Sequence, residues 1–444
     1  MRVCLGMSVM SLWMCGAVVG LSSTTASASK SYLADVPLGP PDAILGIAED
    51  FKKCTSPDKV NVCVGAYRDE QGKPWILPSV KEAERQMLES TTINKEYAPI
   101  VGNPAFVRKA LEFAYGKEIM DSRSVAGTAT LSGTGACRIG GAFLAKFLPA
   151  GTRIYIPNPT WGNHIAIFKE AGLDVHRYRY YNTDTNSLDF DGLKEDLAGA
   201  PEGSVILLHA CAHNPTGCDP TDAQWNEIAD VCSSHHVFFD CAYQGFASGD
   251  SEKDASAIRS FVNNDSKFAS VMLAQSFAKN FGLYGERCGT LSILTQNDEE
   301  KERVMSQLKL IIRPMYSSPP IHGANIVETV LSSEELAEQY QGECAHMANR
   351  IGAMRTALVD KLKEAGSTHD WSHITSQIGM FAYTGMNADM CNILTKDYSI
   401  FLTKDGRVSL AGLNDNNIEY VAKAIHAVTD GKPITTSPED QMSA

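Results

Sequence analysis

The chain has 444 residues, a length that allows roughly two or three domains and a large buried core. Hydrophobic residues make up 44% of the sequence and charged residues 20%, which is ordinary for a soluble globular protein and argues against a disordered chain. The formal net charge of −13 argues against nucleic acid or an anionic membrane surface as the main partner, although a local basic pocket can still bind a small anion.

The first 29 residues have the composition of a targeting segment. An apolar run from Val3 to Leu21 follows one arginine, no acidic residue precedes Asp35, and small residues follow at 26–28. This pattern is typical of a secretory signal with a cleavage site, or of a bipartite plastid signal. We therefore exclude residues 1–29 from the fold and expect no membrane association of the mature chain.

Twelve cysteines are scattered along the chain without a C-x-x-C pair and without a Cys/His cluster at metal spacing. This pattern argues against a zinc site, and we expect no metal. Cysteine inside an apolar segment usually packs as a buried free thiol. The cysteines in such segments are Cys63, Cys137, Cys211 and Cys241. A reducing compartment is the simplest interpretation of these residues.

Short apolar runs alternate with longer helical patterns through the middle of the chain. The runs lie at 128–132, 153–156, 205–210, 237–240 and 271–275. Apolar strands interleaved with helices predict a mostly parallel α/β sheet covered on both faces, where ligands bind beyond the carboxyl ends of the strands. We assign this large domain to residues 75–345.

Both ends of the chain are expected to form a second, smaller α/β domain. One helical face ends at Gly366, which is a typical helix stop. Its apolar positions are Ile351, Met354, Leu358, Leu362 and Ala365. Residues 373–386 and 406–412 predict two or three strands, and residues 417–428 predict a closing helix.

The N-terminal arm has too few apolar residues to fold alone. We therefore assign residues 30–74 to the arm and to part of the small domain, residues 346–431 to the rest of that domain, and residues 432–444 to a flexible tail.

Polar residues gather where the predicted strands end. Ser132, Gly133 and Thr134 follow the first strand and open a helix, whose N-terminus can hold a phosphate; a plain turn is the alternative. Asn214 lies in a turn fixed by proline and glycine after the strand at 205–210. Its amide can reach a ligand there, and a capping amide is the alternative.

The next two strands end in charged residues. Asp240 ends the strand at 237–240, Tyr243 follows it, and Lys279 and Arg287 come after the strand at 271–275. Burial near an apolar strand lowers the pKa of a lysine, which favours a nucleophile at position 279. A lysine, a carboxylate and a phosphate loop are what pyridoxal phosphate requires.

Several stretches carry a family resemblance. They are HACAHNPTG at 209–217, FFDCAYQGFASGD at 238–250, QSFAKNFGLYGER at 275–287, RPMYSSPP at 313–320 and GRVSLAG at 406–412. Together they resemble the aspartate aminotransferase family, class I enzymes of fold type I, from about residue 36 to about residue 429. The resemblance implies a large domain with a mostly parallel seven-stranded sheet sandwiched by helices, plus a smaller α/β domain from both chain ends.

The resemblance also implies catalytic roles. Lys279 would form the Schiff base with pyridoxal 5′-phosphate and then move the substrate proton, and Asp240 would keep the pyridine nitrogen protonated. Tyr243 and Asn214 would hydrogen-bond the ring hydroxyl, and Trp161 would stack on the ring face.

The phosphate would be held by a further set of side chains and backbone groups. These are Ser132, Gly133, Thr134, Ser276 and Arg287, together with Tyr97, which the family sends across a dimer interface. His164 and His209 would lie behind Asp240 and orient its carboxylate.

Two arginines would select the substrate. Arg407 would bind the substrate α-carboxylate beside Gly65, and Arg313 would reach from the partner subunit to the distal carboxylate; Trp161 and Asn214 would also contact the substrate. Ser318 departs from the asparagine usual in the family. We therefore expect dicarboxylic amino and oxo acids as substrates and a homodimer with shared active sites.

The implied reaction is a ping-pong transamination, L-aspartate + 2-oxoglutarate = oxaloacetate + L-glutamate. The alternatives are an aromatic or broad-range class I aminotransferase and a catalytically idle homologue that binds the cofactor. The variants WGNH, GLYGER and RPMYS resemble the mitochondrial branch, so we expect a mitochondrial enzyme, although the leader itself looks secretory or plastid-like.

Overall fold

The computed structural model describes residues 31–39 and 45–434. The predicted targeting segment at 1–29 and residues 435–444 of the predicted tail lie outside the described residues. The chain forms two compact units, residues 1–41 and 42–444. In the first unit a short 3-10 helix, η1, covers Tyr32–Asp35, and the Ser31 hydroxyl accepts a hydrogen bond from the Leu33 N–H at its start.

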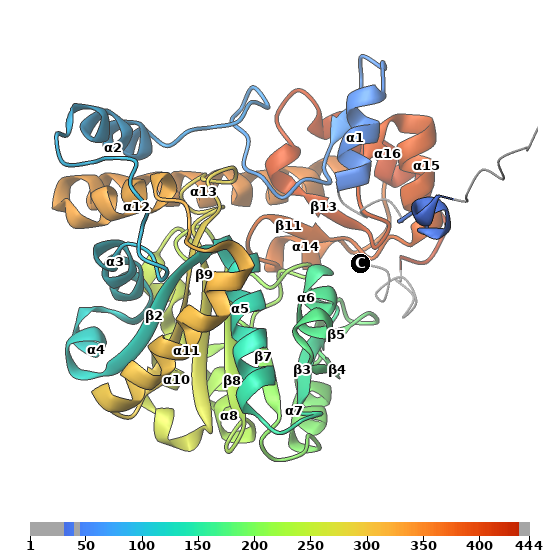
Figure 1. Cartoon of the computed structure of the whole chain (residues 1–444). Coiled ribbons are helices and arrows are strands. Elements are labelled where there is room, and N and C mark those ends of the chain that lie inside the picture. The colour runs from blue at the N-terminus through green and yellow to red at the C-terminus, as the bar shows by residue number, and fades with distance from the viewer. Residues whose placement is uncertain (1–30, 40–44, 435–444) are drawn as a thin grey trace, which may run out of the picture. The chain divides into compact units, whose positions relative to one another are not determined.

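A seven-stranded sheet forms the centre of the second unit (Figure 1). Its strands, in spatial order, are β2 (Ser124–Leu131), β10 (Cys288–Thr295), β9 (Ser270–Ser276), β8 (His236–Cys241), β7 (Val205–His209), β3 (Arg153–Asn158) and β4 (Asp174–Arg179). β10 runs antiparallel to both of its neighbours, and the remaining pairs are parallel. The prediction of a mostly parallel seven-stranded sheet is confirmed.

Apolar side chains point to both faces of this sheet. Leu207 and Phe238 belong to one buried cluster, whereas Leu208 and Phe239, one residue further along each strand, belong to another. Successive side chains of a strand point to opposite faces, so strands that are apolar at every position must be covered on both.

Helices accordingly pack on both faces. The first face carries α5 (Ser132–Phe147), α6 (Asn163–Ala171) and α11 (Asp298–Tyr316). The second carries α3 (Pro104–Tyr115), α4 (Lys117–Ser122), α7 (Phe190–Ala198), α8 (Asp222–Val231) and α10 (Ser256–Asn263). Shorter elements are the hairpin of β5 (Tyr181–Asn182) and β6 (Ser187–Leu188), α9 (Ser251–Asp254) and η2 (Asp265–Lys267).

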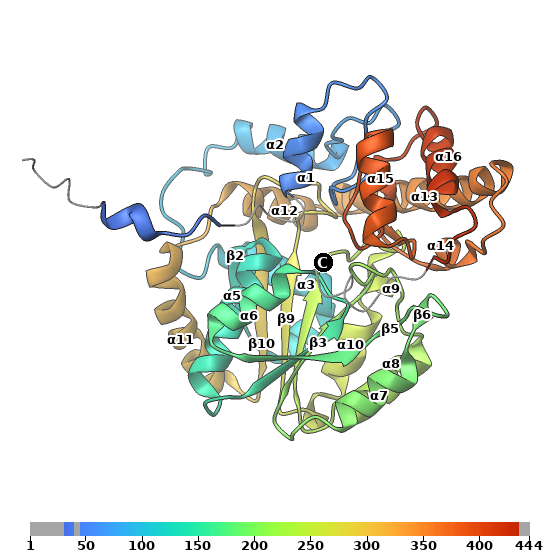
Figure 2. The ribbon, with the colours of Figure 1, turned by 90° about the vertical axis from the view of Figure 1, so that its right-hand side faces the viewer.

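A second group of elements joins the two ends of this unit. β1 (Val60–Asn61) pairs in parallel with β12 (Ile400–Phe401), and β11 (Phe381–Tyr383) pairs antiparallel with β13 (Arg407–Ser409). The helices of this group are α1 (Leu45–Lys53), α2 (Pro78–Glu89), α12 (His322–Ser332), α13 (Glu334–Glu364), α14 (Ser372–Ser376), α15 (Ala388–Tyr398), α16 (Ile418–Thr429) and the 3-10 turn η3 (Leu410–Gly412). Figures 1 and 2 both show the N-terminal α1 beside the C-terminal α15.

One local prediction is wrong in this group. Part of the predicted strand region at 373–386 forms α14 instead. The reason is local, since the Asp370 side chain accepts a hydrogen bond from the Ser372 N–H at the start of the helix. The Ile374 and Gln377 N–H groups then donate to the Trp371 and His373 carbonyls. The predicted domain boundary between residues 345 and 346 lies within α13, a continuous helix that begins at Glu334 and ends before Gly366 at φ +94.

No helix among the described residues combines the length and the apolar character that a bilayer span requires.

Candidate active site

A cavity of about 320 Å³ lies at the carboxyl ends of the parallel strands. The structure brings there every predicted cofactor residue except Tyr97, and Gly65 as well. The predicted residues that line the cavity are Gly65, Ser132, Gly133, Thr134, Trp161, His209, Asn214, Asp240, Tyr243, Ser276, Lys279 and Arg287. Parallel strands place their ends on one edge of the sheet, which is why residues far apart in sequence meet there.

Lys279 follows β9 and lines this cavity. Its Nζ lies 5.0 Å from the centroid of the Tyr243 ring. Burial lowers the pKa of Lys279; the charge of Asp240 opposes this shift, whereas the charges of Arg287 and Arg407 add to it. A lysine with a lowered pKa loses its proton more easily near neutral pH and can then act as a nucleophile or a base.

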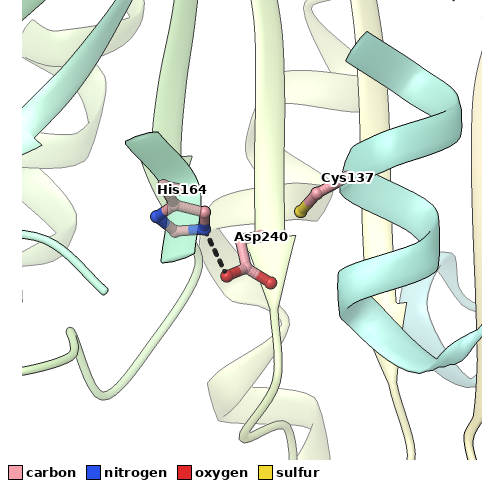
Figure 3. Close-up of side chains that lie close together, drawn as sticks. All are labelled: Cys137, His164 and Asp240. Atoms are coloured by element: carbon pink, nitrogen blue, oxygen red, sulfur yellow. Dashed lines mark hydrogen bonds and ion pairs between the residues drawn. The ribbon is translucent and has the colours of Figure 1, made fainter. Parts of the chain in front are cut away.

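Asp240, at the end of β8, belongs to a chain of hydrogen bonds. Its Oδ2 lies 3.1 Å from Nε2 of His164, as Figure 3 shows. Nδ1 of His164 lies 2.9 Å from the Thr160 hydroxyl, which lies 3.2 Å from Nε2 of His209. The backbone N–H of Asn214 donates to Nδ1 of His209 across 3.3 Å.

The order of these hydrogen bonds determines which atom donates in each of them. Because Nδ1 of His209 accepts a hydrogen bond, a neutral His209 ring carries its proton on Nε2 and donates to Thr160. The Thr160 hydroxyl then donates to Nδ1 of His164, which leaves Nε2 of His164 to donate to Asp240. Burial lowers the pKa of His209 to about 3, so the ring is neutral at physiological pH. The two histidines thus orient the carboxylate.

The Asp240 carboxyl is ionised in this setting. Burial opposes its ionisation, but the hydrogen bond from His164 and the charge of Lys279 lower its pKa. A buried carboxylate that faces the cavity is suited to hold a proton on a ligand nitrogen.

Cys137, His164 and Asp240 form a group of potential metal ligands whose donor atoms lie within 4.8 Å of one another (Figure 3). Burial and the nearby Asp240 charge raise the pKa of the Cys137 thiol well above its usual value, so the thiol stays protonated. Both ring nitrogens of His164 are engaged, Nδ1 with the Thr160 hydroxyl and Nε2 with Asp240. We therefore interpret this group as part of the wall behind Asp240.

The start of α5 forms a cradle for an anion. Leu131 precedes this helix and provides no side-chain cap, so its first N–H groups remain available. The hydroxyls of Ser132 and Ser276 lie 2.8 Å apart, and a Cβ added to Gly133 would lie 3.3 Å from Cβ of Ser276. A side chain at position 133 would therefore require Ser276 to shift by a few tenths of an ångström. Arg287 adds a positive charge to the same cavity.

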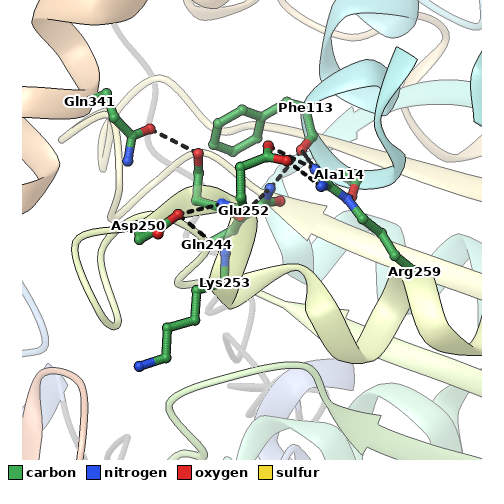
Figure 4. A network of polar contacts seen from close by, with 9 residues as sticks. Phe113, Ala114, Gln244, Asp250, Glu252, Lys253, Arg259 and Gln341 are labelled. Atoms are coloured by element: carbon green, nitrogen blue, oxygen red, sulfur yellow. Dashed lines mark hydrogen bonds and ion pairs between the residues drawn. The ribbon is translucent and has the colours of Figure 1, made fainter. Parts of the chain in front are cut away.

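A network of polar contacts anchors the loop after β8 (Figure 4). The Gln244 side chain donates to the carbonyls of Phe113 and Ser251, at 2.6 and 3.2 Å. Arg259 pairs with Glu252 and donates to the Ala114 carbonyl. The loop is thereby tied to the end of α3.

A further bond joins the two loops that carry the reactive residues. Nδ2 of Asn280 donates to the Gln244 carbonyl across 3.0 Å. Tyr243, next to Gln244, is 4% exposed, and its hydroxyl has no hydrogen-bond partner among the described residues. A buried hydroxyl of this kind needs a partner, and the cavity is where a ligand can supply one.

Arg407, on β13, is buried beside the cavity. Its Nη1 donates to Oδ1 of Asn214 and its Nη2 to the Cys63 carbonyl, at 3.1 and 3.3 Å. Its guanidinium carbon lies 4.2 Å from the centroid of the Phe381 ring. A Cβ added to Gly65 would lie 2.7 Å from Cζ of that ring, so the packing leaves no room for a side chain at position 65.

The structure does not bring Tyr97 or Arg313 to this cavity. Tyr97 is 86% exposed. Arg313 is exposed in the last turn of α11, where its Nη1 donates to the Ser317 hydroxyl across 2.5 Å. Ser318, the predicted departure from the family pattern, is partly buried after that turn.

Sequence reasoning missed several residues of the cavity and its surroundings. Cys211, Ala242, Ala278 and Tyr284 line the cavity, and Thr160 joins the two histidines. Tyr284 has a visible signal, since it lies in the glycine-rich turn between Lys279 and Arg287. The apolar residues and Thr160 have none, because only the folded chain determines what they face.

Comparisons with known proteins agree with this geometry. The family model described as aminotransferase class I and II matches residues 57–425. The mitochondrial aspartate aminotransferase of Dictyostelium discoideum is 51% identical over 407 residues, which cover 91% of this chain and 94% of that protein.

Solved structures agree as well. A mitochondrial aspartate aminotransferase from Trypanosoma brucei superposes with a TM-score of 0.82 at 44% identity, covering 87% of this chain and 100% of that one. The aromatic-amino-acid aminotransferase from Burkholderia pseudomallei, covalently bound to pyridoxal phosphate, has a TM-score of 0.85 at 40% identity and covers 90% of this chain and 100% of that one. The chain belongs to the class I and II aminotransferase family.

Proposed function

We propose that this protein is an aspartate aminotransferase that uses pyridoxal 5′-phosphate to move an amino group from L-aspartate to 2-oxoglutarate. The observation that carries the proposal is the position of Lys279, whose pKa burial lowers, in one cavity with Asp240 and the open start of α5. The matched relatives that bear the aspartate aminotransferase name are about half identical to this chain over most of its length.

The residues present fit the cofactor. A phosphate group fits at the N-terminus of α5, where the first N–H groups have no side-chain cap and Gly133 leaves space beside Ser276. Arg287 adds a positive charge there. The ionised Asp240 carboxylate suits a protonated ring nitrogen, and the unpartnered hydroxyl of Tyr243 suits the ring hydroxyl. When bound, pyridoxal phosphate supplies an electron sink for negative charge at the substrate α-carbon.

Each residue of the chain then has a task. We assign to Nζ of Lys279 the attachment of the cofactor and the transfer of the proton from the substrate α-carbon. Asp240, oriented by His164, holds the proton on the ring nitrogen, and Tyr243 and Asn214 bind the ring hydroxyl. Trp161 lines the same cavity and is assigned to the ring face.

Substrate selection is assigned to two arginines. Arg407 binds the α-carboxylate in its buried place beside Asn214. Arg313 binds the distal carboxylate of the partner subunit's substrate, and Tyr97 binds the partner's phosphate group. Both are exposed and remote from their own cavity, which supports a role across a homodimer interface.

We also propose the arrangement and location of the chain. Residues 75–345 form the large domain, residues 30–74 and 346–431 form the small one, and residues 432–444 form a tail; the pairing of β1 with β12 supports this division. The matched relatives named mitochondrial favour a mitochondrial location. Imaging residues 1–35 fused to a fluorescent protein tests it, and a plastid or endoplasmic-reticulum pattern would contradict it.

The visible spectrum of the purified holoenzyme tests the function. We expect L-aspartate to change the cofactor absorption band and 2-oxoglutarate to restore it, in the wild type but not in Lys279→Ala. An absorption band that L-phenylalanine changes but L-aspartate does not would favour the aromatic alternative. A band that responds to neither would favour an idle homologue.

A further inference from the structure

Asp219 lies in the turn that follows β7 and is absent from the cavity lining described above. Its carboxylate accepts two backbone hydrogen bonds, one on each oxygen. Oδ2 accepts from the Ala212 N–H at 2.6 Å, and Oδ1 accepts from the His213 N–H at 2.9 Å. These are the two residues that directly precede Asn214 in the chain.

The backbone that Asp219 holds is unfavourable on its own. Ala212 has φ +48, a left-handed conformation that costs a residue with a side chain on the order of 1–2 kcal/mol. The turn is tight as well, because the Gly217 N–H donates to the His213 carbonyl across 2.7 Å. Charged acceptors make stronger hydrogen bonds than neutral ones, so a carboxylate is well suited to stabilise this shape.

The shape determines where Asn214 points. Its side-chain oxygen accepts from Nη1 of Arg407 at 3.1 Å, and its backbone N–H donates to His209 at 3.3 Å. A rotation of the peptide planes at Ala212 and His213 would move both groups. The two hydrogen bonds of Asp219 to the Ala212 and His213 N–H groups connect its carboxylate to this segment.

We propose that Asp219 is a positioning residue for the transamination site, which sets the orientation of Asn214 and, through Asn214, that of Arg407. This inference rests on the proposed function. It differs from a purely structural role, in which Asp219 would contribute only to the stability of the turn.

A double-mutant cycle separates the two roles. The variants are Asp219→Asn, Asn214→Ala and the two combined, each measured as holoenzyme normalised to bound cofactor. Asparagine keeps the shape of aspartate but turns an N–H₂ toward one of the two backbone donors. We expect Asp219→Asn to lower kcat/KM for L-aspartate by about 10- to 100-fold, as a misplaced site residue does.

In the Asn214→Ala background the same substitution is expected to lower kcat/KM by less than about threefold, because residues that act through one another are not additive. The Asn214→Ala substitution itself removes the group that Asp219 orients. Equal losses in both backgrounds, or a fall in melting temperature without a change in kcat/KM, would overturn the proposal.

Glu343 supplies a matched control. It is a buried carboxylate that accepts bonds from the N–H and the hydroxyl of Ser79, at 2.9 and 2.5 Å, at the start of α2 and outside the cavity. We expect Glu343→Gln to lower the melting temperature and to leave kcat/KM within about twofold of wild type.

Two further outcomes keep the interpretations apart. If Asp219→Asn yields no holoenzyme, Asp219→Glu takes its place, because it keeps the charge and moves it by one methylene group; the same non-additivity is expected with Asn214→Ala. A wild type without activity on L-aspartate contradicts the proposed function, whereas an active wild type with an unaffected Asp219→Asn variant contradicts only this inference.

Discussion

Arg407 donates a 3.1 Å hydrogen bond from Nη1 to the side-chain oxygen of Asn214, 193 residues away in the sequence. The bond connects β13 with the loop after β7. The Nε atom of Arg407 has no hydrogen-bond partner among the described residues, although Arg407 is only 5% exposed. A buried guanidinium with a free donor is prepared to bind a carboxylate.

Arg407→Gln should therefore remove substrate binding. Loss of one partner from a buried, hydrogen-bonded charge pair costs on the order of 2–5 kcal/mol, which corresponds to roughly 30-fold to several thousandfold in kcat/KM for L-aspartate. Steady-state kinetics measures the loss. Arg153→Gln is the control, because Arg153 forms an exposed pair with Asp174 at the opposite end of β3. An equal loss in the control would contradict the assignment.

Gly65→Ala should disturb the packing around Arg407. The added Cβ would lie 2.7 Å from Cζ of Phe381, the ring on which Arg407 rests. The ring must shift, and we expect kcat/KM for L-aspartate to fall by roughly 10- to 100-fold. A double variant with Phe381→Leu should recover part of the loss, since the smaller side chain removes the clash.

Gly342→Ala is the control for this change. Gly342 lies within α13, and a Cβ there meets no atom within 4 Å. Alanine in an open helical position should stabilise the protein by about 0.4–1 kcal/mol without changing kcat/KM. If Gly65→Ala behaves in the same way, position 65 has no special packing role.

The sequence predicted most of the cavity because its residues follow a simple rule. Asp240 lies at the end of one apolar strand, Lys279 and Asn214 follow two others within a few residues, and parallel strands end at one edge of the sheet. The antiparallel β10 was missed, since Gly289, Thr290 and Ser292 interrupt its apolar residues although all three are buried. Periodicity identifies a strand by its burial and does not give its direction.

The sequence also did not predict side-chain contacts between residues that lie far apart along the chain. Arg355 donates to backbone carbonyls on either side of Ile378, in the region where α14 replaces part of a predicted strand. The role of Asp219 has the same origin, since nothing in the stretch 211–219 reveals which N–H groups its carboxylate accepts. Such pairings depend on three-dimensional distances that no spacing rule encodes.

Arg313→Ala should lower kcat/KM selectively for dicarboxylic substrates. We expect a loss of roughly 30-fold or more with L-aspartate and a much smaller loss with L-phenylalanine, which has no distal carboxylate to leave unpaired. The ratio of the two kcat/KM values measures the selectivity. Arg303→Ala, an exposed arginine paired with Glu299 on the same helix, should leave the ratio unchanged.

Mixed dimers test whether Arg313 acts across the interface. Lys279→Ala and Arg313→Ala chains carrying different tags are co-expressed, and the heterodimer is purified. One of its two sites combines an intact Lys279 with an intact Arg313 from the partner, so about half of the wild-type activity on L-aspartate is expected. If Arg313 served its own subunit, both sites would be defective and the heterodimer would be nearly inactive.

His209 should make the folded protein sensitive to acid. Burial lowers its pKa from 6.5 to about 3, so below pH 6.5 the unfolded chain binds a proton that the folded chain rejects. Stability is therefore lost as the pH falls from 6.5 toward 3, by about 1.4 kcal/mol per pH unit from this group.

The variant His209→Gln removes this loss of stability. We expect the difference in free energy of unfolding between wild type and variant to shift against the wild type at this rate in urea titrations. Thr160→Val breaks the adjacent hydrogen bonds without removing a titrating group, and its cost should vary far less with pH. Parallel profiles for wild type and His209→Gln between pH 6.5 and 4.5 would show that the buried ring does not stay neutral.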